Sequence, residues 1–173
     1  VSDFSWSPDS TRLALVAREK EDEPKPAPDA AGGAAANGKP KTPKPIEITR
    51  YHFKQDGTGY LTGKPSQIWL FTIETKKTER LTTAGGFDEM GPVWSPDGSR
   101  LAFWRRPEET AENRYPRNQL CTAEAKPGAP VLVVSADERV GSGRGGRPVW
   151  SADGKSLAFL VGREPRFRAY NRS

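Results

Sequence analysis

The sequence predicts an all-β fold, namely a partial β-propeller built of four-stranded antiparallel blades with W-S-P-D-G hairpin repeats. The main observation is a phrase that occurs three times: F-S-W-S-P-D-S-T-R-L-A-L-V from Phe4, V-W-S-P-D-G-S-R-L-A-F-W from Val93 and V-W-S-A-D-G-K-S-L-A-F-L-V from Val149. The composition agrees, because 17 Gly and 16 Pro in 173 residues favour short strands joined by turns. The third observation is the spacing, since 88 and 56 residues separate successive repeat tryptophans and a blade takes about 40 to 50.

Each copy of the phrase predicts a β-hairpin, with a strand that ends in Trp, a tight turn and a second strand L-A-L or L-A-F. Pro8 and Pro96 suit the second position of the turn, where φ lies near about −65°. Gly98 and Gly154 supply the positive φ with which the chain reverses. Ser10 replaces this glycine in the first copy, so we expect a less regular turn there.

The recurring aromatic and acidic residues of the phrase have structural interpretations. We expect Trp6, Trp94 and Trp150 to pack between neighbouring sheets rather than to stack on a ligand. The aspartates occur singly, one in each turn, where such a side chain caps backbone amides; they are Asp9, Asp97 and Asp153. A calcium loop needs several oxygen ligands close together, so these residues predict no metal site.

The three hairpins divide residues 1–173 into about two and a half blades. The predicted map places two strands of one blade at Asp3–Arg18 and its last two at Gln67–Thr82, a second blade at about Met90–Ser135, and the first strands of a third at Pro148–Val161. Within the second blade, the strand-like pieces after the hairpin are Gln119–Glu124 and Pro130–Ser135. Both ends of this piece cut through architecture that needs neighbouring blades.

The long first interval contains two additions to the blade. Residues 19–45 are rich in Pro, Ala and Lys and have no large apolar side chain, which predicts a disordered insertion. Its P-K-P-A-P and P-K-T-P-K-P pieces resemble polyproline ligands, but a solvated insertion is the favoured interpretation. Residues 46–61 predict an extra hairpin, because Asp-Gly stands between β-rich flanks.

The residues that carry chemistry form no recognisable site, and we predict no catalytic, cofactor-binding or metal-binding residue. The single histidine, His52, lies in a predicted strand, and no G-x-S-x-G is present, so a serine triad within this chain is excluded. Cys121 has no second thiol to pair with and is expected to be an ordinary packed residue. The run G-S-G-R-G-G, Gly141–Gly146, fits a dinucleotide fingerprint formally, but a strand rather than a helix follows it.

The net charge of +5 is concentrated near one end of the chain. Five acids and five lysines cancel between residues 19 and 45, whereas Arg139–Ser173 has eight basic residues and two acids. Phe167 and Tyr170 lie among these basic residues, a pattern that also occurs in proteins binding single-stranded nucleic acid. We favour a solvated or subunit-facing surface and expect no nucleic-acid partner. The sequence contains no run of about 18 apolar residues, so no membrane span is predicted.

The W-S-P-D-G-x-x-L-A-F repeats resemble those of the prolyl oligopeptidase family of serine peptidases and of the Tol-system periplasmic propeller. The order R-Y-H-F-K-Q-D-G-T-G-Y-L (Arg50–Leu61), Q-I-W-L-F-T-I, T-E-R-L-T and F-D-E-M-G-P-V-W-S-P-D-G is similar to the acylaminoacyl-peptidase and dipeptidyl-aminopeptidase-like branch of that family. The chain departs from the pattern at Ser10, at Ala152, which replaces proline, and in the long insertion.

The resemblance implies that the chain is the gating part of a serine exopeptidase or oligopeptidase. In that family a propeller lies over an α/β-hydrolase domain that carries the catalytic Ser, Asp and His, and it restricts entry to short peptides. The expected partners are therefore a C-terminal hydrolase domain of the same polypeptide and short peptide substrates, with no cofactor and no membrane. No catalytic residue of the family maps onto this chain. The alternative is a stand-alone binding propeller of the Tol type, and the compartment, bacterial cytoplasm or periplasm, stays open.

Overall fold

A computed structural model describes eight stretches of the chain, which are residues 1–18, 54–55, 59–60, 65–83, 85–107, 117–135, 139–140 and 146–162. Every regular element in these stretches is a β-strand, in agreement with the predicted all-β class. The chain divides into two compact units, Val1–Glu19 with Gly63–Ser173, and Lys20–Thr62. Among the described residues, no helix is long and apolar enough to cross a membrane.

The smaller unit contains one described strand pair. β3 (Lys54–Gln55) and β4 (Gly59–Tyr60) pair antiparallel, with Lys54 opposite Tyr60. They lie inside the stretch 46–61 that is predicted to form a hairpin. The rest of that stretch, with His52, and the insertion 19–45 lie outside the described residues.

The larger unit begins with a four-stranded antiparallel sheet, called sheet 1. Its strands are β1 (Asp3–Trp6), β2 (Arg12–Arg18), β5 (Ser66–Thr72) and β6 (Lys77–Arg80), in the order β1-β2-β5-β6. The two strand pairs that the sequence assigns to one sheet are therefore joined across the insertion. β2 pairs with β5 over seven residues, from Arg12 opposite Thr72 to Arg18 opposite Ser66.

The second sheet of the larger unit, sheet 2, is also four-stranded and antiparallel. Its strands are β7 (Phe87–Trp94), β8 (Arg100–Pro107), β9 (Gln119–Glu124) and β10 (Val131–Ser135), in sequential order. The sequence predicts this sheet from Met90, and β7 begins three residues earlier. The bounds of β9 agree with the prediction.

A third hairpin follows sheet 2 in the larger unit. β12 (Val149–Trp150) pairs with β13 (Leu157–Ala158), and the short strands β11 (Arg139–Val140) and β14 (Val161–Gly162) pair with each other. The predicted opening hairpin of a third sheet is thus present, whereas β11 was not predicted. None of the described sheets closes on itself.

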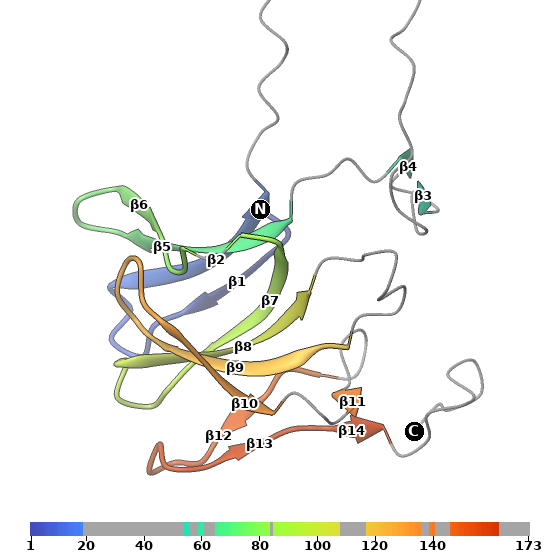
Figure 1. Ribbon diagram of the computed structural model, residues 1–173. Coiled ribbons are helices and arrows are strands. Elements are labelled where there is room, and N and C mark those ends of the chain that lie inside the picture. Colours follow the sequence, from blue (N-terminus) through green and yellow to red (C-terminus); the bar gives the residue numbers. More distant parts are fainter. Residues whose placement is uncertain are drawn as a thin grey trace, which may run out of the picture. The chain divides into compact units, whose positions relative to one another are not determined.

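Sheets 1 and 2 pack face to face, and the third hairpin lies on the other side of sheet 2 (Figure 1). Alternate residues of the central strands meet between sheets 1 and 2, as the two-residue period of a strand requires. The buried cluster between them comprises Ala14, Val16, Ile68, Leu70, Leu81, Trp94, Leu101, Phe103, Cys121, Ala123 and Ala129. A smaller cluster joins Trp104 and Leu120 of sheet 2 to Leu157 and Phe159.

β8 is covered on both faces because it lies in the middle of this stack. Five consecutive residues, Leu101 to Arg105, are buried, and Phe103 is completely inaccessible to solvent. On the second face the ring of Trp104 meets that of Phe159 edge to face, with centroids 6.2 Å apart. A strand buried on both faces shows continuous rather than alternating burial.

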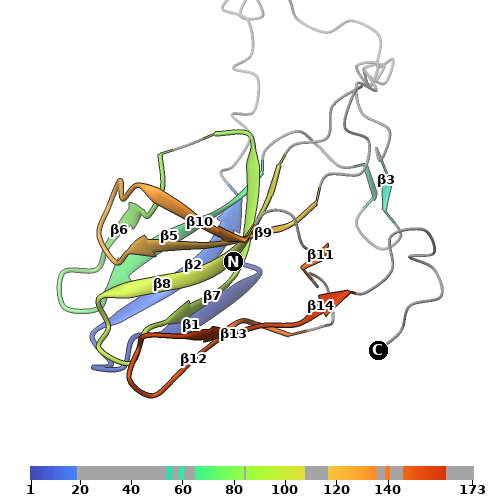
Figure 2. The same cartoon turned by 60° about the horizontal axis from the view of Figure 1, so that its bottom comes forward.

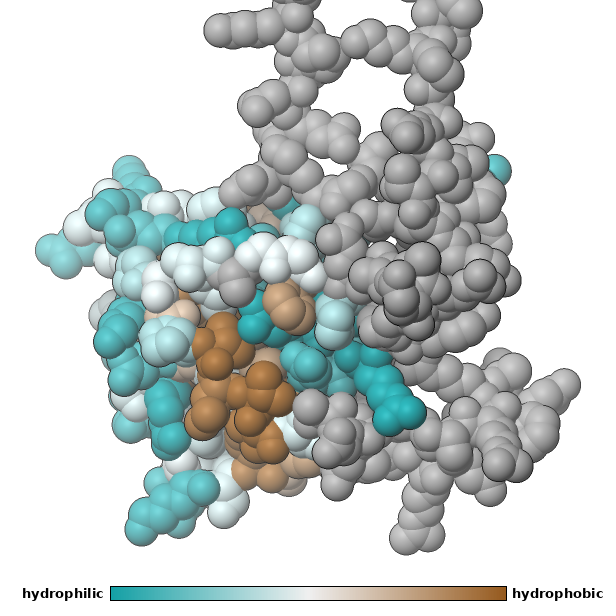
Figure 3. All heavy atoms as spheres, viewed as in Figure 1, coloured by the Kyte–Doolittle hydropathy of each residue, from teal (hydrophilic) through white to brown (hydrophobic). Residues whose placement is uncertain are grey.

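The first strands of the three repeats lie close together along one edge of the stack. β1 and β12 both contact β7, and in Figure 2 the outer strands β6 and β10 lie away from that edge. The outer strand β10 carries a brown, apolar patch in Figure 3, formed by Leu132, Val133 and Val134. β6 instead exposes the oppositely charged pair Lys77 and Glu79.

Candidate functional site

The three repeat turns have the same hydrogen bonds. In the first, the Ser10 N–H donates to the Ser7 carbonyl at 2.9 Å, the bond of a type I turn with Pro8 at its second position. The same 2.9 Å bond closes the other two turns, from Gly98 to Ser95 and from Gly154 to Ser151. The predicted position of the prolines and the predicted positive φ of Gly98 and Gly154, 69° and 67°, are confirmed.

The expectation of a less regular turn at Ser10 is wrong. Ser10 adopts φ 58°, which matches the two glycines, and its turn keeps the common hydrogen bond. A non-glycine residue in this left-handed region costs about 1 to 2 kcal/mol. The other hydrogen bonds of the turn hold Ser10 in a conformation that serine rarely adopts by itself.

A buried or half-buried serine and an aspartate tie each turn together. Ser7 Oγ donates to Asp9 Oδ1 at 2.6 Å, and the Thr11 N–H donates to the same oxygen at 3.1 Å. Ser95 and Asp97, and Ser151 and Asp153, repeat the hydroxyl bond at 2.6 Å. The aspartates therefore cap local amides and hydroxyls, as the sequence predicts.

These hydrogen bonds change the acidity of the turn aspartates. The Ser7 hydroxyl first, and then the Thr11 N–H and hydroxyl, lower the pKa of Asp9 from 3.8 to about 2. The Ser95 hydroxyl and Ser99 act in the same way on Asp97, whose pKa is also about 2. A hydrogen bond to the carboxylate favours its charged form, so these groups stay ionised over most of the acidic range.

An arginine and a tryptophan join sheet 1 to sheet 2. The Arg12 guanidinium lies over the Trp94 ring, with Cζ 4.8 Å from the ring centroid. The same guanidinium donates to the carbonyls of Gly98 and Ala125, at 3.0 and 2.8 Å. The Trp94 indole Nε1 in turn donates to the Ser5 carbonyl of β1 at 3.1 Å. One arginine of sheet 1 thus binds both the tryptophan and the turn of the next hairpin.

The same contact joins sheet 2 to the third hairpin. The Arg100 guanidinium lies 4.8 Å from the Trp150 ring centroid and donates to the Gly154 carbonyl at 2.7 Å. The Trp150 indole donates to the Val93 carbonyl at 3.2 Å. Arg100 is the counterpart of Arg12 in the repeat, and Ser156 stands at this position in the third copy. Each of the two junctions therefore pairs the arginine of one copy with the tryptophan of the next.

The burial of each repeat tryptophan depends on whether the hairpin of the preceding copy lies beside it. Trp94 is 6% exposed, whereas Trp6, which has no preceding described hairpin beside it, is 52% exposed. Packing between sheets is therefore confirmed for Trp94 and Trp150 but not for Trp6. Trp6 therefore lies on a solvent-accessible part of sheet 1.

A buried carboxylate lies at the other end of β7. Glu89 is completely inaccessible to solvent and accepts hydrogen bonds from the Ile68 N–H (3.1 Å) and Thr82 Oγ1 (2.7 Å), both in sheet 1 or its continuation. Its Oε1 lies 3.8 Å from Arg105 Nε, and the Arg105 guanidinium lies over the Phe87 ring. Glu89 thus links the two sheets through hydrogen bonds.

Burial raises the pKa of Glu89, and the bonds from Thr82 and Ile68, with the charge of Arg105, act in the opposite direction. Burial likewise raises the pKa of the Cys121 thiol, to about 11. A thiol of this kind is a poor nucleophile at neutral pH because the reactive species is the thiolate. Cys121 is an ordinary core residue, as predicted.

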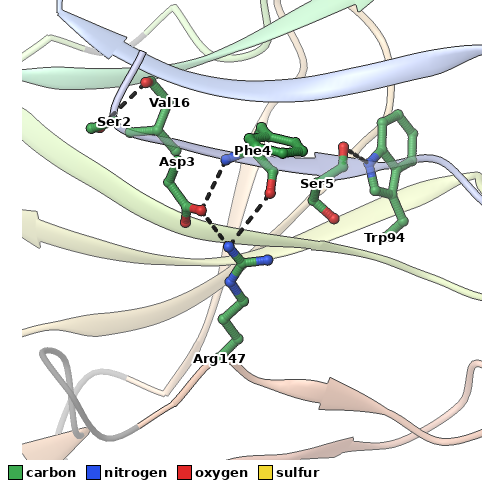
Figure 4. A network of polar contacts seen from close by, with 7 residues as sticks. All are labelled: Ser2, Asp3, Phe4, Ser5, Val16, Trp94 and Arg147. Atoms are coloured by element: carbon green, nitrogen blue, oxygen red, sulfur yellow. Dashed lines mark hydrogen bonds and ion pairs between the residues drawn. The ribbon is translucent and has the colours of Figure 1, made fainter.

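An ion pair along the edge of the first strands completes the polar contacts (Figure 4). Arg147 Nη2 pairs with Asp3 Oδ1 and lies 3.4 Å from the Phe4 carbonyl. In the repeat, Asp3, Gly91 and Arg147 occupy the same position. Gly91 has φ 61°, and a Cβ built there would lie 3.3 Å from Trp104 Cδ1 and 3.7 Å from Arg147 Cγ. The positive φ and the close approach of Trp104 favour glycine at this position, whereas the distance to Arg147 is an ordinary van der Waals contact.

The described residues bring together contacts between sheets rather than a set of catalytic groups. No three His, Cys, Asp or Glu side chains within the described ranges are grouped as metal ligands. Gly146 ends the G-S-G-R-G-G run, and the next regular element is the strand β12, as the sequence predicts. Residues 141–145 and 163–173, with Phe167 and Tyr170, lie outside the described part.

Sequence reasoning missed the roles of Arg12, Arg100 and Glu89. The arginines had a signal, because the same residue follows the turn at the same distance in two of the three copies. Glu89 had none, since a single acid in a strand pattern usually lies on the solvent side. Asp3 and Arg147 are 144 residues apart, and nothing local relates them.

Comparison with known proteins gives a distant relationship to a peptidase. No protein-family model matches the chain. The chain is similar to a protein of Bacillus subtilis (strain 168) described as "Uncharacterized peptidase YuxL", with 26% identity over 122 residues. The match covers 68% of this chain and 17% of that protein, so the chain spans less than a fifth of the relative's length.

Proposed function

We propose that this chain is a non-catalytic segment of the β-propeller of a serine peptidase of the prolyl oligopeptidase family, and that it limits the access of peptides to a hydrolase domain of the same polypeptide. The observation that carries the proposal is a contact that occurs twice, Arg12 over Trp94 and Arg100 over Trp150. In both cases the arginine of one antiparallel hairpin contacts the tryptophan of the next hairpin along the chain. The similarity to a peptidase of Bacillus subtilis supports the assignment to a hydrolase.

The arrangement of the strands supports a propeller in particular. In a propeller the first strand of every blade lines the axis, and the fourth lies at the rim. Here β1, β7 and β12 lie together, and β6 and β10 are the fourth strands of sheets 1 and 2. The ion pair between Asp3 and Arg147 spans the axial edge, where a peptide would pass.

The reaction is tested with the protein that the complete reading frame encodes. It is assayed on chromogenic aminoacyl and acylaminoacyl substrates, with and without a serine-reactive phosphonate. The proposal expects phosphonate-sensitive cleavage, which is lost when the serine of a G-x-S-x-G in the longer protein is replaced by alanine. Absence of cleavage, together with a reading frame that ends within a few more blades, would contradict the peptidase and favour a binding propeller of the Tol type.

The gating role is tested separately, with substrates of increasing length. We expect the long protein to cleave short peptides and to spare folded proteins and long chains. Arg147→Gln removes the ion pair at the axial edge and should raise the cleavage of long relative to short peptides, whereas Lys77→Gln, in an exposed pair on β6, should not. An unchanged length preference in both variants would argue against gating at this edge.

A further inference from the structure

We draw no further inference here: the strongest candidate, the exposed apolar patch of Leu132, Val133 and Val134 on the outer strand β10 of sheet 2, carries none because nothing in the structure shows what covers it.

Discussion

The two ends of β7 join the same pair of sheets by different chemistry. At its C-terminal end, Trp94 is held by Arg12 and by a backbone carbonyl, and this contact is repeated by Arg100 and Trp150. At its N-terminal end, Glu89 is buried among donors from sheet 1, and its counterpart before Trp150 in the sequence is a glycine, Gly145. The first end is encoded by the repeat, whereas the second is specific to one junction.

This difference has an energetic consequence. Arg–Trp contacts contribute modestly, from about 0.5 to 2 kcal/mol, but each new sheet adds another. A buried carboxylate offers little net stabilisation while its partners are present, yet its removal leaves several polar groups unsatisfied. The repeat contact should therefore tolerate change better than the carboxylate.

The largest expected effect is that of Glu89→Ala. The change removes the acceptor of the Ile68 N–H and the Thr82 hydroxyl and leaves Arg105 buried without its carboxylate. Removal of one partner of a buried ion pair costs about 3 to 5 kcal/mol. Urea unfolding measures the loss, and Glu79→Ala, in an exposed pair with Lys77, is the control, with a change of about 0.5 kcal/mol or less. Similar losses in both variants would contradict the difference between the sites.

The second effect compares the two tryptophans of the repeat. Trp94→Leu opens the core between the sheets and removes the bond to Ser5, so we expect a loss of about 2 to 4 kcal/mol. Trp6→Leu in the 173-residue chain changes an exposed side chain and should cost about 0.5 kcal/mol. Thermal or urea unfolding distinguishes them. A large loss with Trp6→Leu would mean that Trp6 is already covered in this chain.

A smaller effect is expected from the left-handed residue of the first turn. Ser10→Gly relieves the positive φ, 58°, and should stabilise the chain by about 0.5 to 1 kcal/mol after the greater freedom of glycine in the unfolded state is subtracted. Gly98→Ser introduces the reverse change, at φ 69°, and should destabilise it by a similar amount. Effects of the same sign in the two variants would show that backbone strain does not decide this position.

The two kinds of acid should respond to pH in opposite directions. The folded pKa of Asp9 and Asp97 is about 2, below the ordinary 3.8, so their contribution is present above 3.8 and is lost as the pH falls toward 2. The folded pKa of Glu89 is raised above 4.5, so its contribution is present below 4.5 and is lost as the pH rises through the folded value.

This opposition is measured by unfolding the wild type, an Asp9→Asn/Asp97→Asn double variant and Glu89→Gln across the acidic range. On acidification, the advantage of the wild type over the double variant should shrink, and its stability relative to Glu89→Gln should rise. Parallel changes in the two comparisons would exclude the assignment of the pKa shifts to different sites.

The sequence predicts the strands and turns of the repeat well because the evidence for them is local, but it did not reveal the contact between Arg12 and Trp94. The turns with their prolines and capping aspartates, and the L-A-F or L-A-L strands that follow them, are predicted from the repeat, and they locate the hairpins of both sheets. Pairing of β2 with β5 also follows, because the repeat shows which strands belong together. The sequence does not predict the regular turn at Ser10, because the hydrogen bonds of Ser7 and Asp9 outweigh the local backbone preference of serine.

The contacts that occur only once among the described residues, those of Glu89 and of Arg147, could not be predicted, because they depend on how the sheets stack. Burial of Glu89 becomes apparent only when β5 and β7 are adjacent. The ion pair of Arg147 with Asp3 likewise forms only because the first strands of the first and third repeats both lie beside β7. The exposure of Trp6 is likewise invisible in its own sequence, which matches that of a buried counterpart. Trp6 and Trp94 have the same local sequence pattern, and they differ in solvent exposure only because different elements lie beside them.

The central claim is that successive sheets are joined by an arginine of one repeat and a tryptophan of the next. A double-mutant cycle of Arg12→Ser and Trp94→Leu in urea unfolding tests it most directly, with Arg12→Ser and Trp150→Leu, which are not in contact, as the control cycle. We predict a coupling free energy of about 1 to 2 kcal/mol for the first cycle, because the cation lies over a desolvated ring. Additivity within about 0.3 kcal/mol in the first cycle would contradict the account.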